Sequence, residues 1–274
     1  MARDGGRRGD PPQSPPPLSV EVIDSHCHLD IMGGDVAHAI AAAQAVGIRR
    51  MVTVGIDLET SRWQARVAAE YPDVYAAVAI HPNEAAEGVD EHTYAEIAEL
   101  AMLPKVRVIG ETGLDYYRTP PERHAAQQES FRRHIAIAKQ TRRTLMIHDR
   151  DAHDDTLRVL AEEGPPERVV FHAFSGDAAI AKVCSDAGYA MSFAGNVTFR
   201  NAQGLRDAAA VAPRDLLLVE TDAPFLTPEP WRGRPNSPYL VPLTLRALAT
   251  ARGEDVDTLA SAVAATSERM FGPW

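Results

Sequence analysis

Short apolar runs alternate along the chain with segments of helical periodicity. The runs are rich in β-branched residues and nearly continuous in apolar character, which is typical of parallel strands buried on both faces. We predict eight strands, over 20–24, 50–55, 74–80, 106–111, 144–148, 168–172, 189–195 and 216–222. The segments between them predict helices over 35–47, 60–71, 93–103, 122–141, 152–163, 177–187 and 201–212.

Eight strand–helix units fit an α/β fold of one domain, the (β/α)8 TIM barrel, expected here over residues 20–274. A doubly wound open sheet is the alternative. The sequence lacks the glycine-rich phosphate loop typical of that fold, which disfavours it. Two more helices, over about 240–251 and 255–270, are expected to close the chain.

Two segments are rich in proline. Residues 1–19 also contain glycine and arginine, bury little apolar area and are expected to form a disordered tail. Residues 223–239 are a long connection after the eighth strand, and loops of this length are usually functional or disordered.

Composition narrows the class of protein. Cys27 and Cys184 form no CxxC pair, so we expect no disulfide framework and a reducing, cytoplasmic setting. No apolar run approaches the roughly 20 residues that span a bilayer, so no membrane contact is expected, and monomer is the default. The net charge of −10 argues against a surface that binds DNA broadly and tightly, but it allows a small phosphate site dominated by metal ions.

Potential metal ligands recur where the predicted strands end. In VIDSHCHLD, His26 and His28 are two residues apart, so they share one face of a strand while Cys27 faces the other way. Four more candidates follow later strands: Glu111, His148, His172 and Asp222. The carboxyl ends of barrel strands meet at one mouth, where this fold builds its active sites.

Six ligands exceed the needs of one tetrahedral ion and fit a site for two divalent ions bridged by a carboxylate, for which we choose Glu111. Imidazole favours zinc or nickel and carboxylate accepts magnesium or manganese, so the identity of the ions stays open. Each residue alone also has a structural explanation: Glu111 can cap a turn, and Asp222 can accept backbone amides. Their coincidence at one end of the strands favours the metal site.

The other histidines follow no such rule. His38, His92, His124 and His134 fall in helical patterns and are expected on the surface. His153 also fits a helix surface, and we assign it no role.

Seven motifs in order resemble the TatD family of metal-dependent deoxyribonucleases, within the amidohydrolase-like superfamily. They are DSHCHLD, AIHPN, IGETGLDYYR, IHDRDAHDD, FHAFSG, ETDAPFLTP and RGRPNSP, and the similarity runs from about residue 21 to 271. The resemblance implies a hydrolase of DNA phosphodiester bonds, a 3′–5′ exodeoxyribonuclease using a water activated by two metal ions. Its substrate would be single-stranded DNA or a 3′ end.

The resemblance also implies roles for single residues. It gives one ion His26, His28 and Asp222, and the other ion His148 and His172, with Glu111 between them. The expected catalytic residues are Glu111, as the bridge, and Asp222, which would orient the water and receive its proton. In family members the last of these motifs commonly reads closer to RGKRNEP. Arg234, Pro235 and Ser237 depart from that pattern, which places substrate contacts from this loop in doubt.

Substrate contacts are expected from Arg150, His81, Arg232 and Asn236. A salt bridge to Asp115 or Asp154 is the alternative for Arg150, and lining the mouth is the alternative for His81. Three aromatic residues can stack bases, although packing is the commoner role: Tyr116, Tyr117 and Phe174. Four carboxylates are candidates to orient the ligand histidines, with Asp115 first among them: Asp24, Asp30, Asp115 and Glu220.

The main rival is an amidohydrolase-type enzyme that opens a lactone, cyclic amide or phosphotriester. Many such sites bridge their metals with a carboxylated lysine. The chain has Lys105, Lys139 and Lys182, and none ends a predicted strand. A scaffold without catalysis is a further alternative, disfavoured by the complete ligand set.

Overall fold

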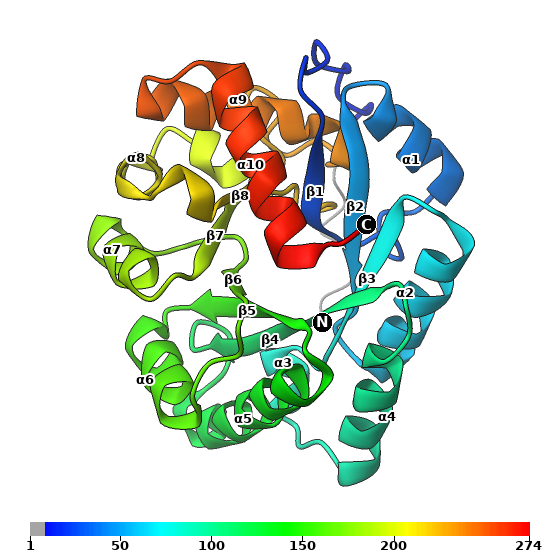
Figure 1. Cartoon of the computed structure of the whole chain (residues 1–274), viewed down its shortest axis with the longest axis vertical. Coiled ribbons are helices and arrows are strands. Elements are labelled where there is room, and N and C mark those ends of the chain that lie inside the picture. The colour runs from blue at the N-terminus through cyan, green and yellow to red at the C-terminus, as the bar shows by residue number, and fades with distance from the viewer. Residues whose placement is uncertain (1–8) are drawn as a thin grey trace.

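A closed barrel of eight parallel strands forms the centre of the molecule (Figure 1). The computed structural model describes residues 9–274. The strands follow chain order: β1 (Val22–Cys27), β2 (Ile48–Val54), β3 (Val74–Val78), β4 (Val106–Asp115), β5 (Thr144–Arg150), β6 (Val169–Phe171), β7 (Ala190–Phe193) and β8 (Leu217–Val219). The first and last strands meet where Cys27 pairs with Ala223 in parallel. The predicted single-domain (β/α)8 barrel is therefore confirmed, and the open sheet is excluded.

Helices surround the barrel (Figure 1). They are α1 (Val36–Gln44), α2 (Leu58–Glu70), α3 (Pro82–Ala85), α4 (Glu91–Ala101), α5 (His124–Thr141), α6 (His153–Glu163), α7 (Ala178–Asp186), α8 (Gln203–Val211), α9 (Val241–Arg252) and α10 (Val256–Phe271). Each predicted helix is present within a few residues of its expected ends. The short α3 was not predicted; it begins at a proline, which suits the first position of a helix.

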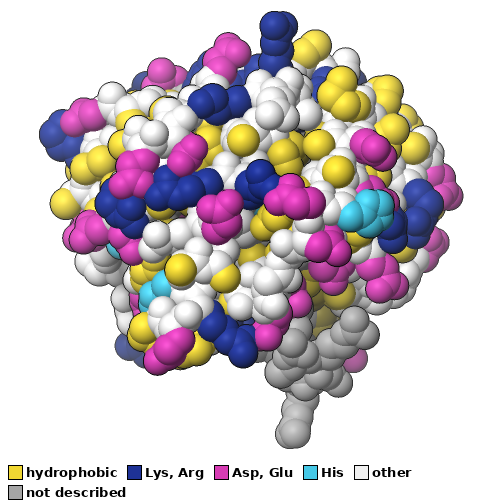
Figure 2. All heavy atoms as spheres, turned by 90° about the horizontal axis from the view of Figure 1, so that it is seen from below, with side chains coloured by type: hydrophobic (Ala, Val, Ile, Leu, Met, Phe, Trp, Pro, Cys, Tyr) yellow, Lys and Arg dark blue, Asp and Glu magenta, His cyan; other side chains and the backbone are white. Residues whose placement is uncertain are grey.

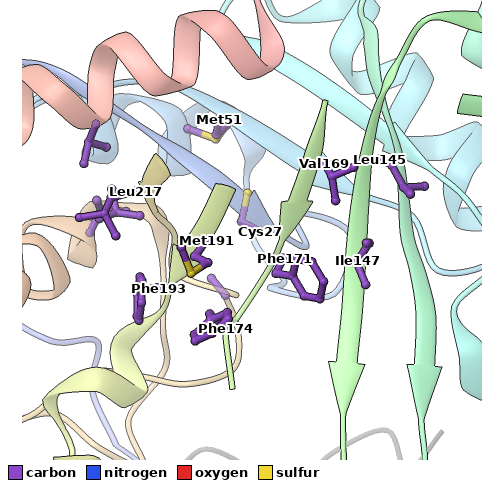
Figure 3. Close-up of a cluster of buried hydrophobic side chains, with 14 of the residues drawn as sticks. Cys27, Met51, Leu145, Ile147, Val169, Phe171, Phe174, Met191, Phe193 and Leu217 are labelled. Atoms are coloured by element: carbon purple, nitrogen blue, oxygen red, sulfur yellow. The ribbon is translucent and has the colours of Figure 1, made fainter. Parts of the chain in front are cut away.

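Alternation along the strands divides the buried residues into two layers. Leu145 and Ile147 of β5 pair in register with Val169 and Phe171 of β6 and pack toward the helices (Figure 3). Met146, between them in sequence, belongs to the cluster that fills the barrel interior. His148, two positions after Met146, therefore faces the barrel axis, and β5 directs its side chain into the mouth.

The prediction that residues 1–19 form a disordered tail is wrong for residues 9–19. Pro12, Pro15 and Leu18 are buried, a spacing of three that suits an extended polyproline helix with one side against the barrel. The Tyr239 hydroxyl donates to the Pro12 carbonyl at 2.7 Å, and the Leu18 amide donates to Val46 O at 3.0 Å. The rest of the predicted tail, residues 1–8, lies outside the described residues.

The surface mixes charges of both signs. Figure 2 shows lysine and arginine side chains interspersed with aspartate and glutamate over the face that it presents. None of the helices within residues 9–274 combines the length and apolar character needed to cross a membrane.

Candidate metal centre

The carboxylate of Glu111 lies between two pairs of imidazoles. Its Oε1 is 2.7 Å from His148 Nδ1 and 2.8 Å from His172 Nε2. Its Oε2 is 3.5 Å from His26 Nε2 and 3.8 Å from His28 Nε2. Each oxygen thus serves one pair, which is the arrangement that a bridging carboxylate requires.

The sixth predicted ligand completes one side of this cluster. Asp222 Oδ1 is 3.7 Å from His26 Nε2 and 3.6 Å from His28 Nε2, and the two Nε2 atoms are 3.1 Å apart. Ligand atoms about 2.0–2.2 Å from a tetrahedral ion lie roughly 3.3–3.6 Å from one another. The spacing of these nitrogens and carboxylate oxygens fits one divalent ion held in common.

The second pair offers a comparable position. His148 Nδ1 and His172 Nε2 are 3.3 Å apart, with Glu111 Oε1 near both. His81 lies on the same side, with its Nε2 3.3 Å from Glu111 Oε1, but its Nδ1 accepts the Asn83 amide, so its Nε2 carries the proton of the neutral ring and is not counted among the ligands. The donor set therefore fits a second divalent ion, and nitrogen donors favour a later transition metal over magnesium.

Irregular pairing of β1 and β4 with their neighbouring strands directs their ligand side chains into the barrel mouth. The register with neighbouring strands shifts between Asp24 and Cys27 in β1 and between Ile109 and Thr112 in β4. Under strict alternation from the interior residue Val108, Glu111 would point outward toward the helices; the irregularity turns it inward instead. Because β4 continues to Asp115, Glu111 lies inside the strand, not at its end as predicted.

Asp222 is held by a backbone conformation that few non-glycine residues adopt, with φ of 51°. Asn236 secures the loop around it, since its side-chain amide donates to the carbonyls of Thr221 and Phe225. The Thr221 amide donates in turn to Asp24 at 2.9 Å. Asn236 is buried with both ends of its carboxamide on backbone groups, so the structure places it as support for Asp222 and not in the open mouth.

Hydrogen bonds orient three of the ligand histidines. His148 Nε2 is 3.3 Å from Asp115, and His172 Nδ1 is 3.3 Å from Glu220, as expected for two of the four candidate carboxylates. His28 Nδ1 donates to the Val54 carbonyl at 2.9 Å, which leaves its Nε2 lone pair for an ion. Of the other two candidates, Asp24 accepts from the Thr221 hydroxyl and from the backbone amide of His26 at 3.2 Å, not from the His26 ring. Asp30 accepts from the Gln64 side chain at 2.8 Å.

The charges of the cluster are strongly coupled. Burial alone would raise the pKa of Glu111, but the surrounding imidazoles of His172 and His81 hold it well below its usual value. Burial and the neighbouring His172 lower the pKa of His26. Burial also opposes protonation of His28, yet the carboxylates of Asp222 and Glu111 outweigh it and raise the pKa to about 9. Glu111 is thus an anion at neutral pH, as a ligand must be.

The two predicted arginines lie on aromatic rings. The guanidinium carbon of Arg150 is 3.9 Å from the ring centroid of Tyr117, and that of Arg232 is 4.2 Å from the ring centroid of Phe199. Neither arginine pairs with a carboxylate among residues 9–274, so the salt bridge considered for Arg150 does not form. Within residues 9–274 no hydrogen bond or ion pair joins either side chain to a predicted metal ligand.

His134 was expected on the surface, and the structure shows this expectation to be wrong. The residue is fully buried in α5. Its Nδ1 donates to Ser130 O at 2.8 Å, and its Nε2 accepts the Ile80 amide at 3.1 Å. His134 lies three residues after Phe131 and four before Ala138, on the apolar stripe of its helix, and this spacing is the signal that could have revealed its burial.

This burial predicts a pH-dependent contribution to stability. Burial lowers the pKa of His134 from 6.5 to about 4, so the unfolded chain takes up a proton first as the pH falls. This stabilisation is fully present at a pH above the pKa that His134 has in the unfolded chain. It is lost as the pH falls toward the lower pKa that His134 has in the folded protein. Between about pH 7.5 and pH 4.5, the metal-free protein should lose about 2–3 kcal/mol more unfolding free energy than His134→Gln. Urea unfolding at both pH values measures this, and parallel losses in both proteins would contradict it.

The eight-stranded barrel, with histidines and carboxylates gathered around Glu111 at its mouth, is typical of metal-dependent hydrolases. The sequence profile of the family described as TatD related DNase matches residues 23–272. The chain belongs to this family.

Individual relatives agree over nearly the full length. An uncharacterized metal-dependent hydrolase, TatD, of Mycobacterium tuberculosis is 43% identical over 260 residues, covering 92% of this chain and 98% of that protein. The corresponding hydrolase YabD of Bacillus subtilis is 37% identical over 91% of this chain and 98% of its own. The crystal structure of YjjV, a TatD homologue of Escherichia coli, superposes with a TM-score of 0.86 at 27% identity, covering 92% of this chain and 98% of that chain.

Proposed function

We propose that this protein is a nuclease that hydrolyses phosphodiester bonds of DNA, removing nucleotides from a 3′ end with the help of two divalent ions. The observation that carries the proposal is the position of Glu111, with one carboxylate oxygen toward each pair of histidines. The family to which the chain belongs supports DNA as the substrate.

The ions would supply positive charge that polarises the phosphate and lowers the pKa of a water at the site. Asp222, beside His26 and His28, would orient that water and receive its proton. The Nδ1 of His81 accepts the Asn83 amide at 3.1 Å, so neutral His81 carries its proton on Nε2. That N–H can donate to a phosphate oxygen held over Glu111.

The two arginines extend this site. Within residues 9–274 neither Arg150 nor Arg232 forms an ion pair with a carboxylate, and each guanidinium lies over an aromatic ring. A guanidinium in this state can donate to two oxygens of one phosphate. We assign them to phosphates beyond the scissile one.

The rival amidohydrolase chemistry has less support. Glu111 lies between the two pairs of histidines, where a bridging ligand would be needed, and the three lysines lie elsewhere: Lys105 precedes β4, and Lys139 and Lys182 lie on α5 and α7. The phosphotriesterase homology protein of Escherichia coli shares the fold, with a TM-score of 0.65 at 14% identity, which carries no information about substrate.

The proposal includes a reducing, cytoplasmic setting, which the two buried free cysteines support. Monomer remains our prediction for the oligomeric state.

The test is an assay of metal-depleted and metal-restored protein on single-stranded DNA labelled at its 5′ end. We expect no cleavage after depletion and, after manganese, zinc, nickel or magnesium is restored, a ladder of products that shortens stepwise from the 3′ end. A parallel panel of lactones, cyclic amides and phosphotriesters tests the rival chemistry. Cleavage that persists unchanged in chelator, or turnover confined to the rival substrates, would overturn the proposal.

A further inference from the structure

We propose that Tyr117, backed by Arg150, is a stacking platform for one unpaired nucleobase of the substrate, next to the metal centre. The proposal rests on the nuclease function proposed above and adds the form in which the strand is recognised. Tyr117 is 64% exposed, and the guanidinium carbon of Arg150 lies 3.9 Å from its ring centroid. One face of the ring is therefore covered by a flat cation, and the ring remains largely open to solvent.

The platform stands at the edge of the metal site. Asp115, two residues before Tyr117, contacts the ligand His148 at 3.3 Å. Arg150 follows His148 by two residues on β5, so both side chains leave the strand on the same side, about 6.6 Å apart along it. The Tyr116 amide donates to Arg150 O at 2.9 Å and fixes the end of β4 against the end of β5. A nucleotide beside the scissile phosphate would reach this edge.

The other two aromatic candidates are already engaged. Phe174 is buried at 2% exposure in the hydrophobic core (Figure 3). The ring of Tyr116 stacks on His124, with centroids 3.6 Å apart and planes within 4°, and its hydroxyl donates to Asp155 at 2.7 Å. Of the three residues considered from the sequence, Tyr117 alone is exposed to solvent over most of its side chain.

The charge of Arg150 suits the same nucleotide. No carboxylate among residues 9–274 pairs with it, so its positive charge is not neutralised locally. With its carbon 3.9 Å from the ring centroid, the guanidinium covers one face of Tyr117 and keeps N–H groups that can donate to a phosphate while a base stacks on the other face. Tyrosine and arginine together thus fit a base and its phosphate, and stacking of this kind accepts any base.

This geometry predicts a preference for single strands. A base can lie on Tyr117 only after leaving its neighbours in the duplex, which costs a few kcal/mol in paired DNA and little in a single strand. Single-stranded or frayed 3′ ends should therefore be better substrates than blunt duplex ends, and a diester without a base should gain nothing from the platform.

The experiment removes the ring and the base separately. Wild type, Tyr117→Ala and Tyr117→Phe are assayed on an oligonucleotide with normal bases and on a series in which one abasic residue occupies successive positions from the 3′ end. Tyr117→Ala should lower kcat/KM on the normal oligonucleotide roughly 5- to 150-fold. Tyr117→Phe should stay near wild type because it keeps the ring. When the abasic residue occupies the position that stacks on Tyr117, kcat/KM of the wild type should fall to the value of Tyr117→Ala. The kcat/KM of Tyr117→Ala itself should fall little further on that substrate.

Stacking is also read directly from 2-aminopurine placed at that position. Its fluorescence should be quenched on binding to wild type and to Tyr117→Phe, but not on binding to Tyr117→Ala. Met102→Ala, which removes an equally exposed apolar side chain at the end of α4, serves as the matched control and should behave as wild type.

The failures are distinguishable. If wild type cleaves no oligonucleotide with any restored metal, the nuclease function and the platform both fall. If wild type cleaves DNA but Tyr117→Ala has the same kcat/KM as wild type, the platform alone is overturned. The same holds if the ratio of wild-type to variant kcat/KM is equal for every position of the abasic residue. Equal losses in Tyr117→Phe and Tyr117→Ala would show that the hydroxyl, and not the ring, makes the contact, and would also overturn it.

Discussion

Replacing Glu111 by glutamine is expected to leave the protein with fewer than two bound ions and without measurable phosphodiesterase activity. Glutamine keeps the shape of glutamate but replaces one carboxylate oxygen with an NH2 group, which cannot bind a metal. One oxygen of Glu111 faces His148 and His172, and the other faces His26 and His28. Whichever way the amide turns, one side of the cluster loses its shared ligand.

Metal content and activity are both measured for Glu111→Gln. Affinity for the ions should fall by more than the roughly 10- to 100-fold that loss of a ligand's hydrogen-bond partner costs. Glu122→Gln, an exposed glutamate in the loop that follows β4, is the matched control and should retain both ions. A Glu111→Gln protein that holds two ions with unchanged affinity would show that Glu111 does not bridge them.

Asp222→Asn is expected to lower kcat about 10²- to 10⁴-fold, the range usual for loss of a positioned proton acceptor. Asparagine keeps one oxygen beside His26 and His28 but cannot take a proton from water at neutral pH. The backbone at this position is held by Asn236, so the loop should keep its shape. KM for the oligonucleotide should change little, because Asp222 acts on the water and not on the strand.

The comparison needs protein that carries its full complement of ions, so metal content is measured alongside turnover. Asp154→Asn changes an exposed aspartate in the first turn of α6 and should leave kcat unaltered. Near-normal turnover by fully loaded Asp222→Asn would remove Asp222 from its proposed role as proton acceptor.

Much of the architecture was predictable because hydrophobic pattern and topology act together. Continuous apolar runs such as 144–148 and 216–222 indicated buried parallel strands, and their regular alternation with helices indicated a barrel. Once the strands are known, the barrel itself brings their carboxyl ends together. For this reason residues as distant in sequence as His26 and Asp222 could be grouped without any structure.

What escaped prediction depends on tertiary contacts. Glu111 was expected at the mouth, but it reaches the mouth from inside β4 through a local irregularity that leaves no mark on the apolar pattern. Asn236 was expected to touch substrate, but its partners are backbone carbonyls that only the folded loop brings near. Residues 9–19 have the composition of a disordered segment, and they pack because Tyr239 and Val46 lie where the segment passes.

The central claim is that one glutamate and its neighbours hold two ions at the barrel mouth. Anomalous diffraction from crystals of the manganese-loaded protein tests it most directly. We predict two peaks about 3.5–4 Å apart, one on each side of the Glu111 carboxylate. A single peak, or peaks that do not touch Glu111, would contradict the account.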